Sequence, residues 1–230
     1  MNQDRINHEE RSSVPRIKII RNGPYLVSGD VPLSKQTIEI DSTGHSCGWE
    51  KGEQYPTQET YILCRCGRSK NKPFCDGTHI KVNFDGTEKA DGEPYLKKAK
   101  TIYGPTIDLT DAREFCAVAR FCDRAGGIWK LVKQSDKPEA RRLAEEEARD
   151  CPSGRLVVWD KSGKAIEPDF EPSIVIVEDP KENNEGPIWV RGNITIESEV
   201  GNIYERRNRV ALCRCGKSSN KPFCDGTHCK

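Results

Sequence analysis

Short runs of β-branched and aromatic residues alternate with polar turns at both ends of the chain. In the N-terminal part such runs occur within residues 17–40 and at Thr60–Leu63, and in the C-terminal part within residues 174–198 and at Arg209–Leu212. Enrichment of this kind between turns that contain Gly, Pro and Asn predicts antiparallel strands. Each end of the chain is therefore predicted to form a small β structure.

The middle of the chain has a different pattern. Residues 110–122 and Pro138–Asp150 are predicted to be helices, the second because a proline suits the first turn of a helix. Short strands are predicted to flank these helices at residues 106–109 and 156–159. The fold class expected for the whole chain is α+β, with an α+β segment inserted between two β-rich units.

Composition limits how large a core the chain can build. Of the 230 residues, 34% are hydrophobic and 32% are charged, above the roughly 25% charged of an average globular protein. Small cores commonly depend on metals or disulfides for stability. The net charge of +1 gives no electrostatic argument for a nucleic-acid or membrane partner, and we expect neither.

The N-terminal residues 1–14 are polar and mixed in charge, and no apolar run approaches the roughly 18 residues of a membrane span. We expect a flexible tail on a cytoplasmic protein. Eleven cysteines are many for a reducing compartment, where disulfides rarely persist. Their odd number and short C-x-C spacing favour metal ligands over a disulfide scaffold.

A sixteen-residue segment occurs twice. Residues 64–79 read CRCGRSKNKPFCDGTH and residues 213–228 read CRCGKSSNKPFCDGTH, which agree at 14 of 16 positions. Each copy presents three cysteines and one histidine in the spacing C-x-C-x8-C-x3-H. The candidate metal ligands are Cys64, Cys66, Cys75, His79, Cys213, Cys215, Cys224 and His228.

Two kinds of metal site suit this donor set. Thiolates are the usual ligands of iron–sulfur clusters, and histidine is a recognised substitute that raises the reduction potential. Three cysteines and one histidine also make a closed zinc site, although C-x-C is tighter than the usual zinc spacing C-x2-C. Residues alone therefore leave open an iron–sulfur centre and a zinc site that stabilises an interaction module.

The duplicated segment resembles the CDGSH iron–sulfur domain of the NEET proteins through the string C-x-C-x2-S-x2-K-P-x-C-D-G-x-H, with Thr78 and Thr227 where the family has serine. The resemblance implies one [2Fe–2S] cluster on each three-cysteine, one-histidine set. It also implies electron transfer, cluster donation or redox sensing. Chains with two such motifs resemble a dimer folded within one chain, so we expect a monomer with an intrachain pseudo-dimer.

Three further cysteines lie in the middle segment. Five residues separate Cys116 from Cys122, and Cys151 precedes Pro152. This pattern, C-x5-C followed by C-P-S-G, resembles divergent single-cluster ferredoxins and implies a third cluster, either [3Fe–4S] or [4Fe–4S]. The loop departs from that family because Ala-Val-Ala-Arg-Phe is apolar and helix-prone. In the alternative interpretation these cysteines are small buried hydrophobic residues.

The predicted function is binding of iron–sulfur clusters for electron transfer or cluster transfer, with a redox partner or an apo-acceptor protein. A redox or pH sensor and a zinc-stabilised module are the alternatives. No catalytic motif was found, so we expect no enzyme activity. The expected divisions are a tail (1–14), a first CDGSH-type unit (15–85), a linker (86–105), a ferredoxin-like α+β segment (106–165) and a second CDGSH-type unit (166–230).

Overall fold

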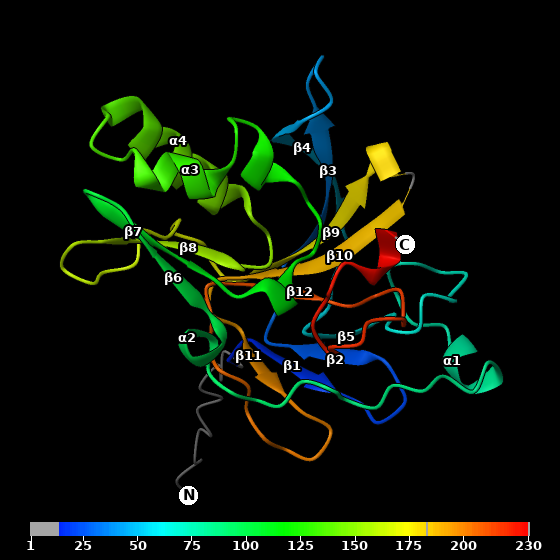
Figure 1. Ribbon diagram of the computed structural model, residues 1–230. Coiled ribbons are helices and arrows are strands. Elements are labelled where there is room, and N and C mark those ends of the chain that lie inside the picture. Colours follow the sequence, from blue (N-terminus) through cyan, green and yellow to red (C-terminus); the bar gives the residue numbers. More distant parts are fainter. Residues whose placement is uncertain (1–13, 183, 230) are drawn as a thin grey trace, which may run out of the picture.

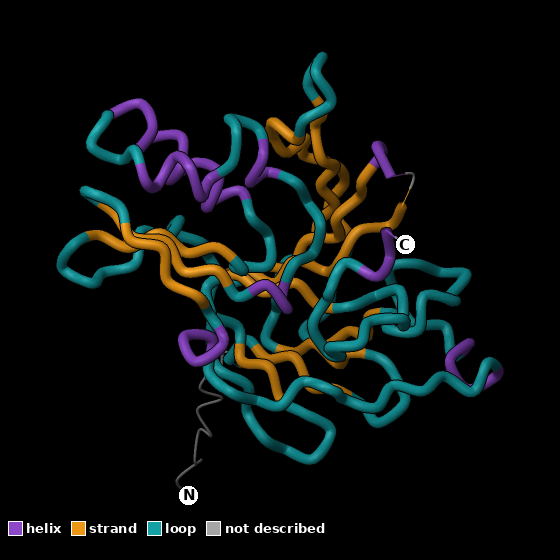
Figure 2. The backbone as a smooth tube through the Cα atoms, viewed as in Figure 1, coloured by secondary structure: helices purple, strands orange, loops and turns teal. Residues whose placement is uncertain are grey.

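The computed structural model describes residues 14–182 and 184–229. They form three β-sheets and a few short helices, which confirms the α+β class (Figures 1 and 2). The tail expected at residues 1–14 lies outside the described residues except for Val14, which is exposed. Within the described ranges, no helix combines the length and the apolar character that crossing a membrane requires.

The first sheet has four strands in the order β11-β1-β2-β5. Strand β2 pairs antiparallel with β1 and with β5, whereas β1 pairs parallel with β11. The burial of β1 and β2 alternates along the chain, as expected for strands with one face against a core. The bounds are β1 (Arg16–Ile19), β2 (Tyr25–Ser28), β5 (Thr60–Leu63) and β11 (Thr195–Glu197).

The second sheet has five strands in the order β12-β10-β9-β3-β4. Its central pairing, between β3 and β9, is parallel, and the other neighbours are antiparallel. The bounds are β3 (Leu33–Ile40), β4 (Ser46–Tyr55), β9 (Ser173–Asp179), β10 (Asn184–Arg191) and β12 (Arg209–Leu212).

Each of these sheets contains strands from both ends of the chain, because β11 joins the first sheet and β3 and β4 join the second. Strand β11 follows β10 in sequence but joins the first sheet through Ile17↔Ile196, and β3 follows β2 but joins the second sheet through Leu33↔Ile174. The two ends of the chain therefore exchange strands, and neither sheet is complete without the other end.

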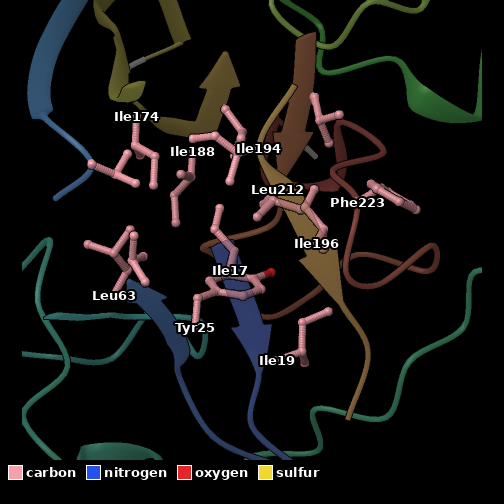
Figure 3. Packing of buried hydrophobic residues seen from close by; sticks show 14 of the residues in the cluster. Ile17, Ile19, Tyr25, Leu63, Ile174, Ile188, Ile194, Ile196, Leu212 and Phe223 are labelled. Atoms are coloured by element: carbon pink, nitrogen blue, oxygen red, sulfur yellow. The ribbon is translucent and has the colours of Figure 1, made fainter. Parts of the chain in front are cut away.

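The main core lies between these two sheets and takes residues from both ends of the chain (Figure 3). Ile17 and Tyr25 come from the first sheet, and Ile174, Ile188 and Leu212 from the second, and all are at most 1% exposed. Burying such side chains contributes roughly 1.5–3 kcal/mol each. The shared core therefore joins the two ends into one body.

The third sheet carries the inserted segment. It is antiparallel in the order β6-β7-β8, and helices α3 and α4 pack together over it (Figure 1). A second core, which includes Ile107, Leu109 and Val158, fills the space between helices and sheet. The bounds are β6 (Lys100–Tyr103), β7 (Ile107–Asp111), β8 (Leu156–Asp160), α3 (Ile128–Lys133) and α4 (Pro138–Asp150).

The remaining helices are single turns. They are α1 (Thr78–Lys81), α2 (Tyr95–Lys98) and the 3-10 turns Arg113–Phe115, Phe121–Asp123, Pro180–Glu182 and Thr227–Cys229. Two predictions were wrong. Residues 110–122 form the end of β7, two 3-10 turns and a loop instead of a helix, and the linker expected at 86–105 contains α2 and β6. The loop is not helical because Val118 and Arg120 have left-handed φ angles of 56° and 61°.

Candidate metal centres

The first duplicated segment brings its four predicted ligands together as two pairs. Strand β5 ends at Leu63, and the Sγ atoms of Cys64 and Cys66 then lie 3.8 Å apart. At the other end of the loop, the Sγ of Cys75 lies 3.3 Å from Nδ1 of His79. The structure thus forms a dithiol pair and a thiol–imidazole pair.

The second segment repeats this arrangement. Cys213 and Cys215, which follow β12, have Sγ atoms 3.6 Å apart, and the Sγ of Cys224 lies 3.5 Å from Nδ1 of His228. Two ligands of one tetrahedral metal ion have similar separations, because bonds of about 2.3 Å to sulfur and 2.0–2.1 Å to nitrogen place sulfurs about 3.8 Å apart and sulfur and nitrogen about 3.5 Å apart. Each pair fits the coordination of one metal ion.

In the described part of the chain, no three His, Cys, Asp or Glu side chains converge closely enough to hold one ion. A binuclear cluster needs two ligands on each of its two metals, which is the pairwise pattern seen here. The donor set, three thiols and one imidazole, also suits an iron–sulfur cluster in its chemistry. The residues of both segments therefore fit the group that the sequence implies.

Both ligand loops are held by the same contacts. The backbone amide of Cys64 donates to Pro73, and the amide of Cys213 donates to Pro222, each at 2.8 Å. Asp76 accepts from the backbone amides of Lys70 and Thr78, at 2.8 and 2.9 Å, and Asp225 accepts from the amides of Ser219 and Thr227. These bonds lower the pKa of both aspartates, so both carboxylates stay ionised and fix the turn between the third cysteine and the histidine.

The arginine between the first two cysteines is buried and points away from the ligands. Arg65 is 1% exposed, stacks over Tyr25 and donates to the carbonyl of Gly86. Arg214 is 6% exposed and donates to the carbonyls of Gly186 and Val177. Each guanidinium is hydrogen-bonded to the surrounding backbone and so holds its loop in place. This fixes the orientation of the two flanking cysteines.

Burial changes the acidity of the thiols. It raises the pKa of Cys66, Cys75 and Cys224, because a thiolate is costly away from water. The hydrogen bond from Cys213 lowers the pKa of Cys215 to about 6. A bound cation reverses the burial penalty and removes the thiol protons, so these sites are suited to a positively charged metal centre.

The three cysteines of the inserted segment line one cavity. Cys116 and Cys122 lie at either end of a loop that curves around it, and Cys151 enters after α4. Burial raises the pKa of Cys122 to about 12. Val118 and Arg120, with their left-handed φ angles, make this loop strained, and such strain occurs mostly at binding and active sites. Three thiols around one cavity fit a cluster with three cysteine ligands.

Known families match the regions of the chain that contain these residues. The model of the iron-binding zinc finger CDGSH type matches residues 22–80 and again residues 185–229. This chain carries two CDGSH-type regions. Between them, residues 102–161 match the model of the divergent 4Fe-4S mono-cluster. The matches support binding of iron–sulfur clusters.

Curated relatives resemble the CDGSH-type regions over short stretches. CDGSH iron-sulfur domain-containing protein 1 of rat and that of mouse are each 48% identical over 40 residues, which is 17% of this chain and 36% of the relative. The mitochondrial CDGSH iron-sulfur domain-containing protein 3 of mouse is 68% identical over 22 residues, 10% of this chain and 16% of the relative. The chain thus matches about a third, or less, of the length of these relatives.

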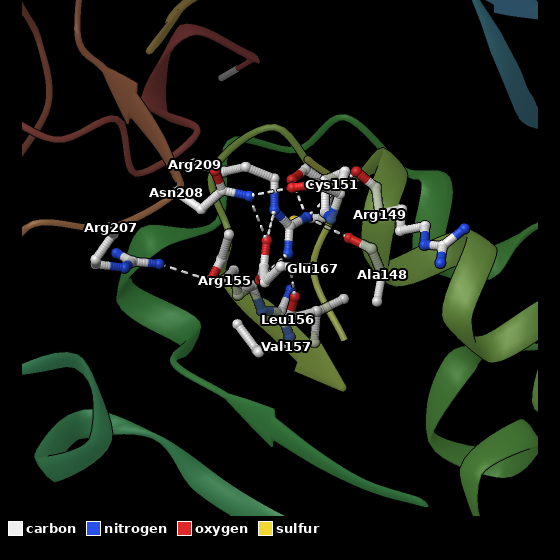
Figure 4. Close-up of polar contacts among 12 residues, drawn as sticks. Ala148, Arg149, Cys151, Arg155, Leu156, Val157, Glu167, Arg207, Asn208 and Arg209 are labelled. Atoms are coloured by element: carbon white, nitrogen blue, oxygen red, sulfur yellow. Dashed lines mark hydrogen bonds and ion pairs between the residues drawn. The ribbon is translucent and has the colours of Figure 1, made fainter. Parts of the chain in front are cut away.

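Two arginines that the sequence pattern did not predict, the buried Arg209 and the half-buried Arg120, connect the inserted segment to the C-terminal part of the chain. Arg209, which begins β12, donates to the carbonyl of Cys151 at 2.8 Å and to that of Ala148, and pairs with Glu167 (Figure 4). Arg120 forms two hydrogen bonds with the buried Asp179. Nothing in the local sequence distinguishes these arginines from surface ones, because their partners lie 42 to 61 residues away along the chain.

Proposed function

We propose that each CDGSH-type region holds one [2Fe–2S] cluster, and that the protein carries electrons between partners rather than transforming a substrate. The first cluster would be held by Cys64, Cys66, Cys75 and His79, and the second by Cys213, Cys215, Cys224 and His228. When bound, the clusters supply reversible one-electron redox chemistry. One observation carries the proposal. In both copies of the segment, the four ligands form one thiol–thiol pair and one thiol–imidazole pair, and the donor atoms of each pair are as far apart as two ligands of one metal ion.

We further propose that Cys116, Cys122 and Cys151 hold a third cluster, of the [3Fe–4S] or [4Fe–4S] type. The cavity that they line and the strained loop between the first two support this proposal. The mono-cluster match covers all three cysteines. A ferredoxin-like segment next to a CDGSH-type region suits a protein that moves single electrons.

The contacts between the sites support electron transfer. Gly67, in the first ligand loop, lies so close to the second ligand loop that a Cβ there would be 2.8 Å from the carbonyl oxygen of Cys215. A Cβ on Gly226 would likewise lie 3.0 Å from the carbonyl oxygen of Cys116, and Cys224 packs with Ala117. The three sites are therefore neighbours in the order first, second, third, which suits hopping of single electrons between them.

Electron paramagnetic resonance tests this assignment site by site. We expect the dithionite-reduced protein to give signals from both CDGSH-type sites, and Cys75→Ser and Cys224→Ser each to abolish one of them. Cys122→Ser should abolish only the signal of the third site. Cys47→Ser is the matched control, because Cys47 is exposed and lies outside the three sites. Signals that survive all three ligand substitutions would refute the assignment.

Cluster transfer from the first site is a second candidate function. His79 lines an open groove together with Asn83 and Phe84, whereas the pKa of His228 is lowered by burial. A ligand that lines an open groove gives an acceptor thiol access to the metal that it holds. On incubation with an apo-ferredoxin, the first site should lose its cluster before the second, and retention of both clusters would exclude this candidate.

A further inference from the structure

Arg155 is a buried cation at the edge of the cavity in the inserted segment. It follows the Cys-Pro-Ser-Gly stretch, begins the approach to β8 and is 3% exposed. Its Nη1 donates to the Sγ of Cys116 at 3.2 Å. Its Nε and Nη2 donate to the two carboxylate oxygens of Asp111 at 2.6 and 2.8 Å. One guanidinium thus connects a candidate cluster ligand to a carboxylate.

Neighbouring groups fix the guanidinium in this orientation. Asp111 also accepts a hydrogen bond from Nε1 of Trp129 at 3.0 Å, and the Trp129 ring lies 5.6 Å from the guanidinium carbon. The backbone of Arg155 is held as well, because its carbonyl accepts from the amide of Ala112 and the hydroxyl of Tyr95. The guanidinium of Arg155, the carboxylate of Asp111 and the thiol of Cys116 are therefore held in a fixed geometry.

The planar shape of the Arg155 guanidinium allows it to contact Asp111 and Cys116 at the same time. A guanidinium presents several N–H groups in one plane, so it can bind both oxygens of a carboxylate and still direct a further N–H at sulfur. A lysine ammonium has a positive charge but lacks this planar fork. The Asp111 carboxylate offsets much of the guanidinium charge, so Arg155 acts on the sulfur mainly through its hydrogen bond, which burial strengthens because solvent does not compete for it.

We propose that Arg155 positions Cys116 as a ligand and raises the reduction potential of the cluster in this site. The inference rests on the proposed function of Cys116, Cys122 and Cys151. On one-electron reduction the cluster gains negative charge, part of which lies on the ligand sulfurs. The hydrogen bond that the guanidinium donates to one of those sulfurs stabilises the reduced form more than the oxidised form.

Redox titration followed by paramagnetic resonance tests the proposal on the full chain. Dithionite supplies the electron and ferricyanide removes it, so no bond is made or broken at the site. In Arg155→Met the reduction equilibrium of the third site should shift at least tenfold toward the oxidised form, which equals about 59 mV for one electron. Arg155→Lys, which keeps the charge, should shift it less. Arg124→Met is the matched control, since Arg124 is a half-buried arginine of the same segment that pairs with Asp150.

The outcomes separate this inference from the function on which it rests. A wild-type protein without a third-site signal would refute the proposed third cluster. A third-site signal with the same potential in the wild type and in both Arg155 variants would refute only the role of Arg155. Loss of the signal in the Arg155 variants but not in Arg124→Met, with unchanged circular dichroism, would support the positioning of Cys116.

Discussion

The identity of one ligand in each site sets the redox character of the proposed clusters. His79 and His228 each direct Nδ1 toward a cysteine four residues earlier in the chain. A neutral imidazole in place of an anionic thiolate leaves the cluster less negative and easier to reduce. A histidine ligand in the proposed clusters would give a higher reduction potential than four thiolates would give.

Replacing either histidine by cysteine tests this point. In His79→Cys and His228→Cys the reduction potential of the substituted site should fall by on the order of 100 mV, because an anionic ligand stabilises the oxidised form. Protein-film voltammetry measures each potential. His45→Cys is the control, because His45 lies in an exposed turn and bonds to Thr43. Equal potentials in the wild type and both ligand variants would mean that imidazole is not a ligand.

Two equivalent glycines differ in their surroundings. Gly77 and Gly226 both have left-handed φ angles, 83° and 80°, but only Gly226 is crowded, since a Cβ there would lie 2.2 Å from Cγ2 of Val118. Gly77→Ala should cost about 1–2 kcal/mol for the backbone conformation alone. Gly226→Ala should cost about 1–3 kcal/mol more, because the inserted segment must move. Guanidinium unfolding compares the two, and equal costs would show that the segment does not pack on the second site.

Among the elements, helix α4 carries a buried acid. Glu147 is 0% exposed, one oxygen accepts from the amide of Ala125 at 2.9 Å, and Oε2 has no hydrogen-bond partner among the described residues. Burial raises its pKa from an ordinary value of 4.5 to about 7, against the opposing effects of the Ala125 bond and of Arg124. The folded chain thus holds a proton here that the unfolded chain releases above pH 4.5.

This acid predicts a pH-dependent stability. Between pH 5.5 and 8 the free energy of unfolding should fall by about 2 kcal/mol as the raised pKa is passed, because the folded state binds the extra proton only below it. Glu147→Gln should remove this part of the dependence, whereas Glu146→Gln, at the exposed partner of Arg142, should not. Identical pH profiles for the wild type and Glu147→Gln would show that Glu147 is ionised in the folded protein.

Sequence pattern predicted the elements unevenly, for physical reasons. Strand β5, strand β12 and helix α4 were predicted at their observed bounds, because each has a clear periodicity or a proline at its start. Residues 110–122 were assigned to a helix because they are apolar and helix-prone, yet the loop follows the cavity between Cys116 and Cys122. The ligand sets could be proposed from spacing alone, whereas Arg155 could not, since its contact with Cys116 depends on the packing of β7 and β8.

At the scale of the whole molecule, the strand exchange makes the two ends of the chain interdependent. Local pattern indicates that β3 and β11 are strands but cannot indicate which sheet each joins. Ile196 on β11 is 2% exposed and pairs with Ile17 at the other end of the chain. Each CDGSH-type site thus depends on a sheet that needs a strand from the far end.

Truncating Ile196 tests whether β11 joins the first sheet in solution. Ile196→Ala should cost about 2–5 kcal/mol and should increase amide hydrogen exchange in β1 and β2 more than in β10 and β12. Ile176→Ala on β9 is the matched control, and it should act instead on β3 and β10, its neighbours in the second sheet. Faster exchange in β10 and β12 alone after Ile196→Ala would contradict the exchanged topology.

Iron and acid-labile sulfide, determined together on the anaerobically purified chain, test the central proposal most directly. The proposed clusters predict iron and sulfide in each CDGSH-type site, in equal amounts. Loss of Cys75 or Cys224 should remove the same amount of both. Zinc without sulfide in the folded chain, or iron without sulfide, would contradict the account.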